Sequence, residues 1–243
     1  MTIKNIIFDL GGVILNINNE LIVEAFSCDL GVINFKNLKN QYKEFFEQFE
    51  KGNITPPVFR SEIRKICDLH GVSDDAIDEA WNATLFRSDQ DRHEFVERLA
   101  FIRQLREEGY RVFLFSNTNA IHLTTLRSIF NDWQIEHSQE NHRAPLKNYF
   151  EKEYYSHLIH TRKPEAQGFL SILHENKLEV GETLFIDDML INAQGAKEVG
   201  LHALYLDLTQ GHSILTNVLP YLEQEKNECQ SHLRHSSCSH QVT

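Results

Sequence analysis

Short apolar runs, each followed by a turn or a helical pattern, recur along the chain and predict the strands of a parallel sheet. A strand buried on both faces has a continuous apolar run rather than an alternating one. Four runs have this form and a fifth is weaker: Asn5–Phe8, Arg111–Phe115, Thr183–Ile186, Ala203–Leu206 and, the weaker, Glu153–Ser156. Amphipathic stretches separate them, as in the helix predicted from Phe95, Leu99, Ile102 and Leu105. This alternation predicts an α/β fold with a Rossmann-like, doubly wound parallel sheet.

Residues 18–90 break the alternation and predict an inserted helical segment. Their apolar positions recur at helical spacing, along Leu38, Tyr42, Phe45 and Phe49, after Thr55-Pro56, and along Ile77, Trp81 and Leu85. An apolar stripe on a helix is usually a buried face, so we interpret these aromatic side chains as packing residues. The expected organisation is a discontinuous core of residues 1–17 and 91–222 with a helical cap of residues 18–90.

The polar residues 223–243 lack apolar periodicity, which is typical of a disordered end. A zinc site there is disfavoured, because the spacing of His232, His235, Cys238 and His240 matches no usual zinc pattern. The four cysteines, Cys28, Cys67, Cys229 and Cys238, form no CxxC pair, and we expect them to be reduced thiols.

The composition and the net charge of the chain limit the classes of partner that it is expected to bind. The chain has 243 residues, of which 41% are hydrophobic and 24% charged, with a formal net charge of −11. This charge disfavours non-specific binding to nucleic acid or to an anionic membrane, and it leaves room for a local phosphate site. Asp9 interrupts the first apolar run, which disfavours a signal peptide or a membrane span there. We therefore expect a cytoplasmic protein without a nucleic-acid or membrane partner.

Polar residues follow three of the predicted strands. Asp9 ends the first strand; alone, such an acid is most often a turn former or a helix cap. Ser116-Asn117-Thr118-Asn119 follow the second strand and precede a predicted helix over Ile121–Ile129, where N–H groups favour an anion. Simple N-capping would need only one of these residues. Asp187-Asp188 end a third strand, and Mg²⁺ would relieve the repulsion between adjacent carboxylates.

Lys163 precedes Pro164, which fits the first turn of a helix and would place the lysine at the positive helix end. A cation is mildly unfavourable there. Its position is easier to explain if it pairs with a carboxylate and a phosphate, although most lysines are solvated surface residues.

The segments FDLGGVI, SNTNAIH, RKPEAQGF and FIDDMLINAQGAKEVG resemble, in this order, the four motifs of the haloacid dehalogenase superfamily. They are most similar to its sugar-phosphate phosphatase branch, over Lys4 to Tyr205. The resemblance implies a Rossmann-like core with a helical cap inserted after the first motif. It also implies a Mg²⁺-dependent phosphatase that acts on a small phosphorylated substrate, such as a sugar phosphate.

By motif position, the resemblance also implies roles for individual residues. Asp9 would be the nucleophile, and Lys163 would steady the charge on nucleophile and substrate. The implied phosphate ligands are Ser116 and Asn117. The implied metal ligands are Asp9, Asp188 and the carbonyl of Gly11, with Asp187 and Asn192 in support. Glu50–Gly52 resembles a cap segment that dips towards the substrate.

Gly11 departs from the pattern of most phosphatases in the superfamily, which carry a second aspartate there as general acid and base. The sugar-phosphatase branch often has glycine at this position. Without the aspartate, protonation of the leaving group falls to another residue, to substrate or to metal-bound water. An anomeric phosphate is plausible as substrate, because its leaving group is more acidic than an ordinary alcohol.

Three alternatives remain open at this point. A metal-independent 2-haloacid dehalogenase would use the same nucleophile on carbon, and the paired Asp187-Asp188 argues against it. A phosphomutase would need the proton shuttle that Gly11 does not supply. A non-catalytic protein that binds a phosphorylated metabolite would be consistent with Gly11.

Overall fold

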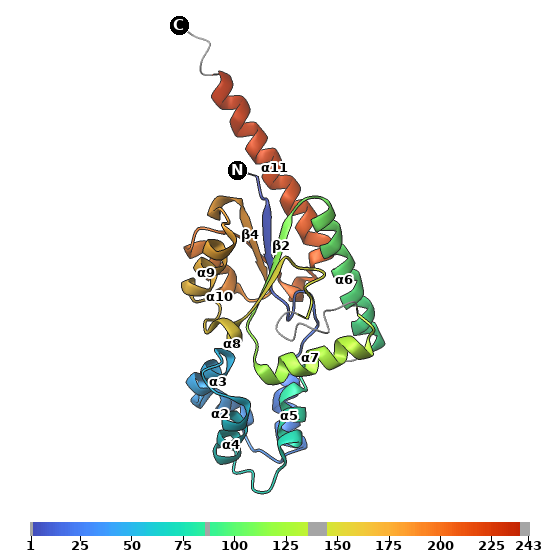
Figure 1. The fold of residues 1–243 in the computed structure, drawn as a ribbon, viewed down its shortest axis with the longest axis vertical. Helices are drawn as coiled ribbons and strands as arrows, with labels where there is room; N and C mark the ends of the chain where they lie inside the picture. The colour runs from blue at the N-terminus through green and yellow to red at the C-terminus, as the bar shows by residue number, and fades with distance from the viewer. Residues whose placement is uncertain (1, 86–87, 136–144, 239–243) are drawn as a thin grey trace.

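The computed structural model describes residues 2–85, 88–135 and 145–238, with side chains up to residue 227. Its centre is a five-stranded parallel sheet in the order β3-β2-β1-β4-β5 (Figure 1). The strands are β1 (Asn5–Phe8), β2 (Arg111–Ser116), β3 (Lys152–Tyr155), β4 (Thr183–Asp187) and β5 (His202–Tyr205). All five expected runs are therefore strands, and the weakest of them is the edge strand β3. The doubly wound α/β fold is confirmed.

Helices cover both faces of the sheet because the strands are apolar on both. Ile6 and Phe8 of β1 belong to a core cluster on one face, and Ile7 between them belongs to a cluster on the other. The first face packs against α6 (Asp89–Glu107), α7 (Ala120–Asp132) and α11 (Ile214–Cys238). The second packs against α9 (Ala166–Asn176) and α10 (Leu190–Glu198). Short segments complete the core: α8 (Ser156–Ile159), η1 (Val180–Glu182) and η2 (Leu208–Gln210).

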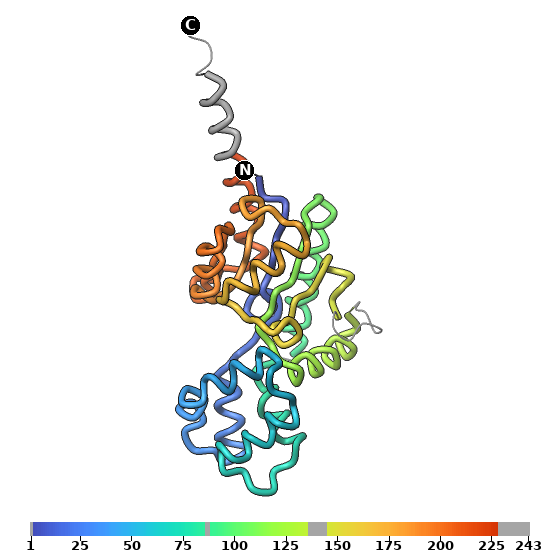
Figure 2. Tube along the Cα trace, turned by 60° about the vertical axis from the view of Figure 1, so that its left-hand side comes forward, coloured from blue at the N-terminus to red at the C-terminus, as the bar shows by residue number. Residues whose placement is uncertain are grey.

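The insertion consists of five helices between β1 and α6, which Figure 2 shows in blue and cyan as a separate group at the bottom of the view. They are α1 (Glu20–Cys28), α2 (Phe35–Gln41), α3 (Lys43–Glu50), α4 (Pro56–Ile66) and α5 (Asp74–Asn82). Their aromatic side chains pack into a cluster of their own, in which Phe35, Phe49 and Phe59 are buried. The interpretation as packing residues is confirmed for Phe45, Phe49, Phe59 and Trp81, whereas Tyr42 is 38% exposed and is not part of the cluster.

Three details differ from the sequence-based expectation. The helix predicted through Tyr42 is divided into two helices, because the backbone of Tyr42 is not helical, with φ −103° and ψ 28°. Tyr42 is the C-cap of α2 and the N-cap of α3. Leu85 lies beyond α5 and pairs with Ile17 in an isolated antiparallel bridge. Pro164 is not in a first helical turn, because α9 begins two residues later at Ala166.

The C-terminal segment is also different from the expected disordered tail, because α11 continues from Ile214 to Cys238. Its last buried apolar residue is Leu222, and the polar residues beyond it include Glu, Gln and Lys, which have high helix propensity. His240 and the side chains of Cys229, His232, His235 and Cys238 lie outside the described residues. Cys28 and Cys67 are free thiols. No helix among the described residues is both long and apolar enough to cross a membrane.

Candidate active site

The carboxyl ends of β1, β2 and β4 meet at one edge of the sheet, because Phe8 is in register with Leu114 on one side and with Ile186 on the other. The residues that follow these strands therefore come together. They open onto a cavity of about 590 Å³ between the sheet edge and the insertion. The sequence-predicted residues that line it are Asp9, Gly11, Ser116, Asn117, Lys163, Asp188 and Asn192.

The ammonium group of Lys163 forms ion pairs with two of the aspartates. Its Nζ lies 2.7 Å from Asp9 Oδ1 and 2.7 Å from Asp187 Oδ2, and the residue is only 1% exposed. Burial alone would lower the pKa of Lys163, but the carboxylates of Asp187 and Asp9 outweigh it and raise the pKa above its usual value. The pairing with carboxylates that the sequence suggested is present, and Lys163 stays charged.

Asn117 holds the backbone of Lys163 in place. Its Nδ2 donates to the Lys163 carbonyl at 2.9 Å, and its Oδ1 accepts from the Lys163 N–H at 2.9 Å. This pair of bonds fixes the loop before α9 against the end of β2. Asn117 therefore has a positioning role that the sequence did not predict.

Asp187 lies beneath the cavity and is fully buried. Besides Lys163, its carboxylate accepts hydrogen bonds from Asn192 Nδ2, at 3.0 and 3.1 Å, and from the Met189 N–H at 2.7 Å. Asp187 thus connects Lys163 to Asn192 and to the turn into α10. Asp188 instead faces the cavity and packs against Gly12, whose positive φ of 79° and missing side chain leave room for the carboxylate.

The carboxylates of Asp9, Asp187 and Asp188 lie close together, and they carry more negative charge than the ammonium group of Lys163 can balance. One oxygen of each lies within 4.8 Å of the others. Burial raises the pKa of Asp9 to about 7, although Lys163 lowers it, and burial followed by the charge of Asp187 raises the pKa of Asp188 to about 6. Hard divalent cations prefer such oxygen ligands and would favour the ionised carboxylates. The donor set therefore fits Mg²⁺.

The four polar residues Ser116–Asn119, at the end of β2 and directly after it, make different contacts. Asn119 is the N-cap of α7, since its Oδ1 accepts from the N–H groups of Ile121 and His122. The Thr118 N–H donates to Ser156 Oγ at 2.9 Å. All four residues line the cavity. Capping thus accounts for only one of them, Asn119, and all four stand where a phosphate could contact them.

Comparison with known proteins identifies the family. The family model described as haloacid dehalogenase-like hydrolase matches residues 3–200. The chain belongs to the haloacid dehalogenase-like hydrolase family. The resemblance inferred from the four motifs is confirmed, and so is the expectation of an enzyme of the hydrolase class.

Two relatives have names that specify different substrates. The chain is 29% identical to D-ribitol-5-phosphate phosphatase from Bacteroides thetaiotaomicron, over 82% of this chain and 89% of the relative. It is 27% identical to a sesquiterpene phosphatase from Aspergillus oryzae, over 84% of this chain and 90% of the relative. A family enzyme of B. thetaiotaomicron, solved in complex with magnesium and inorganic phosphate, is 35% identical with a TM-score of 0.67, over 84% of this chain and 94% of that one.

The family's second aspartate is replaced by Gly11, and the structure shows what stands in its place. A Cβ added to Gly11 would lie 2.8 Å from Cδ1 of Ile17, a residue that also lines the cavity. The space next to Asp9 where a second carboxylate would begin is therefore occupied by an apolar side chain.

The segment Glu50–Gly52 connects the insertion to the core. Glu50 lines the cavity, whereas Lys51 forms an ion pair with Glu165, with 2.5 Å between Nζ and Oε1. Gly52 has a φ of 70° and lies so close to the carbonyl of His157 that a Cβ would overlap it. The segment reaches the site as expected, but only Glu50 of the three faces the cavity.

Several cavity residues were missed by sequence reasoning. Those from the insertion and its two connections are Asn19, Lys43, Glu47 and Thr84, and those from the core are His122 and Arg162. Arg162 could have been noticed, because it precedes Lys163 directly. Lys43 and Glu47 are four residues apart on α3, but nothing in the sequence places that face of the helix at the cavity. The remaining three lie on separate elements, so no sequence pattern marks them.

Proposed function

We propose that this protein is a Mg²⁺-dependent phosphatase that hydrolyses a small phosphomonoester, a sugar or polyol phosphate, with Asp9 as nucleophile. One observation carries the proposal: the Asp9 carboxylate stands at the sheet edge in contact with the buried cation of Lys163 and beside two further carboxylates. The names of two relatives, both phosphatases, support the reaction class. The magnesium and phosphate complex of a similar enzyme supports the metal.

In this mechanism Asp9 attacks phosphorus in line and forms an aspartyl-phosphate, which water then hydrolyses. Lys163 donates to Asp9 Oδ1 and thereby orients the other oxygen for attack. Ser116 and Asn117 hold the phosphoryl group at the start of α7. Bound by Asp9, Asp188 and the Gly11 carbonyl, Mg²⁺ would neutralise the phosphoryl oxygens. Asp187 and Asn192 keep Lys163 in place.

The decisive variant is Asp9→Asn, which keeps the shape of the side chain and removes the nucleophile. Phosphate release from a panel of sugar and polyol phosphates is expected to fall about 10³-fold or more in kcat, as for other essential nucleophiles. EDTA should abolish turnover of the wild type, and added Mg²⁺ should restore it. Thermal unfolding of the variant checks that the fold is intact.

Two results would contradict the proposal. Turnover of Asp9→Asn near the wild-type level would exclude the nucleophile. Retained turnover in chelator, with halide released from 2-haloacids, would favour a metal-independent dehalogenase. The panel should include anomeric and primary-alcohol phosphates, since the absence of a carboxylate at Gly11 favours the former.

A further inference from the structure

His122 lines the cavity, and one of its ring nitrogens has no hydrogen bond to the described residues. It lies in the first turn of α7, and its Nδ1 is 2.8 Å from Oδ1 of Asn82 on α5. Its ring stacks parallel to that of Trp81, with 5.4 Å between the centroids. Figure 1 shows α5 directly next to α7, and the two helices are in contact. The side chain is thus fixed from the insertion on two sides while it lines the cavity.

The hydrogen bond to Asn82 determines the tautomer. An amide oxygen only accepts, so Nδ1 carries the proton and Nε2 keeps its lone pair. Among the described residues Nδ1 is the hydrogen-bonded ring nitrogen, which leaves Nε2 for a ligand. Burial lowers the pKa of His122 to about 3, and the charge of Lys39 lowers it further. The imidazole therefore remains neutral and accepts at Nε2.

Further acceptors line the opposite side of the same cavity. Arg162 donates from Nη1 to Glu47 Oε1 at 3.1 Å and from Nε to Glu50 Oε2 at 2.9 Å. Within the described part of the chain, the second oxygen of each carboxylate has no hydrogen bond. A ligand made only of hydrocarbon would bury these acceptors without donors, which is costly. A ligand with several hydroxyl groups would supply the donors.

We propose that His122 Nε2 accepts a hydrogen bond from a hydroxyl group of the substrate, and that the substrate is a polyhydroxylated phosphomonoester. The inference rests on the proposed phosphatase function and deepens it, because it names the residue that would select for the hydroxyl groups of the substrate. Leu15, Ile17, Leu85 and Leu126 form an apolar wall of the cavity, against which the carbon chain of a polyol packs. His122 is a specificity residue, and Asn82 positions it.

The test compares two substrates of equal chain length that differ in their hydroxyl groups, D-ribitol 5-phosphate and n-pentyl phosphate, and adds farnesyl phosphate as an isoprenoid. A site that binds hydroxyl groups rejects analogues that lack them. With Mg²⁺ present, wild-type kcat/KM is expected to be about 10²-fold or more higher for ribitol 5-phosphate than for pentyl phosphate.

His122→Phe keeps a ring on Trp81 and removes the acceptor, so it should reduce this preference about 10-fold. His122→Gln can restore an acceptor and should recover part of it. His174→Gln, at an exposed position on α9, is the matched control and should keep the wild-type ratio. A ratio unchanged in both His122 variants would overturn the inference. So would a wild type that prefers pentyl or farnesyl phosphate.

Binding separates this inference from the proposed function. Calorimetry with Asp9→Asn and Mg²⁺ measures the affinities for the same phosphates without turnover. Tighter binding of ribitol 5-phosphate, lost in the Asp9→Asn/His122→Phe double variant, supports the role of His122 even if the wild type releases no phosphate. Equal binding of ribitol and pentyl phosphates, or binding of neither, overturns it.

Discussion

Ile17 occupies the space beside Asp9 that a side chain at position 11 would enter. An aspartate introduced there meets the flexible end of an apolar side chain rather than backbone, so the obstacle can be removed by a second substitution. The chemistry around Asp9, the proposed nucleophile, can therefore be tested directly by substitution of single residues.

We predict that Gly11→Asp alone gives little gain, because the new side chain conflicts with Ile17, and that Gly11→Asp/Ile17→Ala raises kcat for primary-alcohol phosphates. A general acid contributes roughly 10²–10⁴-fold, and even a poorly placed one should give about 10-fold. The gain should be smaller for anomeric phosphates, whose leaving groups need less protonation. Steady-state kinetics on both substrate types measures it, with Ile17→Ala as control. An equal gain on both types would show that protonation of the leaving group is not limiting.

The sequence predicted the residues at the sheet edge and missed most of those above it. Asp9 and Asp187 follow strands that have clear apolar runs, so their meeting at one edge follows from the parallel sheet. Glu47 and His122 lie on a helix of the insertion and a helix of the core, and only the placement of the insertion brings them to one cavity. Pro164 was misplaced because its ring fits either a first helical turn or the loop before it.

Two contacts between elements hold the insertion over the core, one on each side of the cavity. On one side α5 meets α7, where Ile121 joins the apolar cluster of the insertion. On the other side the end of α3 meets the segment around α8 through ion pairs of Arg162 and Lys51. Arg162 directly precedes Lys163, so this second contact links the insertion to the loop that carries Lys163.

Arg162→Ala is expected to lower kcat/KM by about 10- to 100-fold, because charge-assisted hydrogen bonds contribute about 1.5–3 kcal/mol and their loss leaves two carboxylates facing an anionic substrate. Phosphate-release kinetics measures the effect. Adding Glu47→Gln/Glu50→Gln should restore part of the activity by removing that repulsion.

Arg60→Ala provides the matched control. Arg60 is similarly exposed, 19% against 21% for Arg162, and it donates two hydrogen bonds to Asp78 inside the insertion. It should lower stability while kcat/KM stays near the wild-type value. Equal kinetic losses in the two variants would mean that the contact between α3 and the core has no special role.

The strands were predictable as elements, including the weak edge strand β3, because each is a short apolar run between breaks. The break between α2 and α3 was not, since the apolar spacing continues through Tyr42. The continuation of α11 was missed because the segment after Leu222 is polar and none of the described side chains at 223–227 is buried, although such residues favour a helix.

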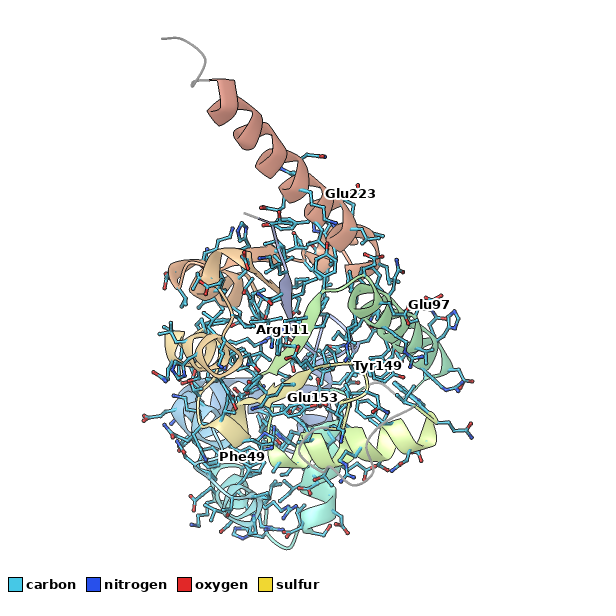
Figure 3. All side chains as sticks on the ribbon, turned by 45° about the horizontal axis from the view of Figure 1, so that its top comes forward. Phe49, Glu97, Arg111, Tyr149, Glu153 and Glu223 are labelled. Carbon is cyan, nitrogen blue, oxygen red and sulfur yellow. The ribbon has the colours of Figure 1, made fainter. Side chains whose placement is uncertain are left out.

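At the scale of the whole molecule, buried carboxyl groups make folding stability depend on pH. Glu153 on β3, labelled in Figure 3, is 8% exposed and accepts a hydrogen bond from the Tyr155 hydroxyl at 2.6 Å. Burial raises its pKa from 4.5 to about 7, against the opposing effect of that bond. The folded protein thus holds a proton that the unfolded chain releases near pH 4.5.

The sign of the effect follows from this difference. The contribution is fully present below pH 4.5 and is lost as the pH rises through about 7, so the free energy of unfolding falls over that range, by ~3 kcal/mol at most. Glu153→Gln keeps an uncharged side chain at every pH. It should match the wild type near pH 5 and be more stable at pH 8. Urea unfolding at both pH values in EDTA measures this, with the exposed Glu198→Gln as control. Asp9 and Asp188 also have raised pKa values and lower the free energy of unfolding over the same pH range, so part of the wild-type decrease should remain in Glu153→Gln. A decrease in Glu153→Gln as large as in the wild type would refute the role of Glu153.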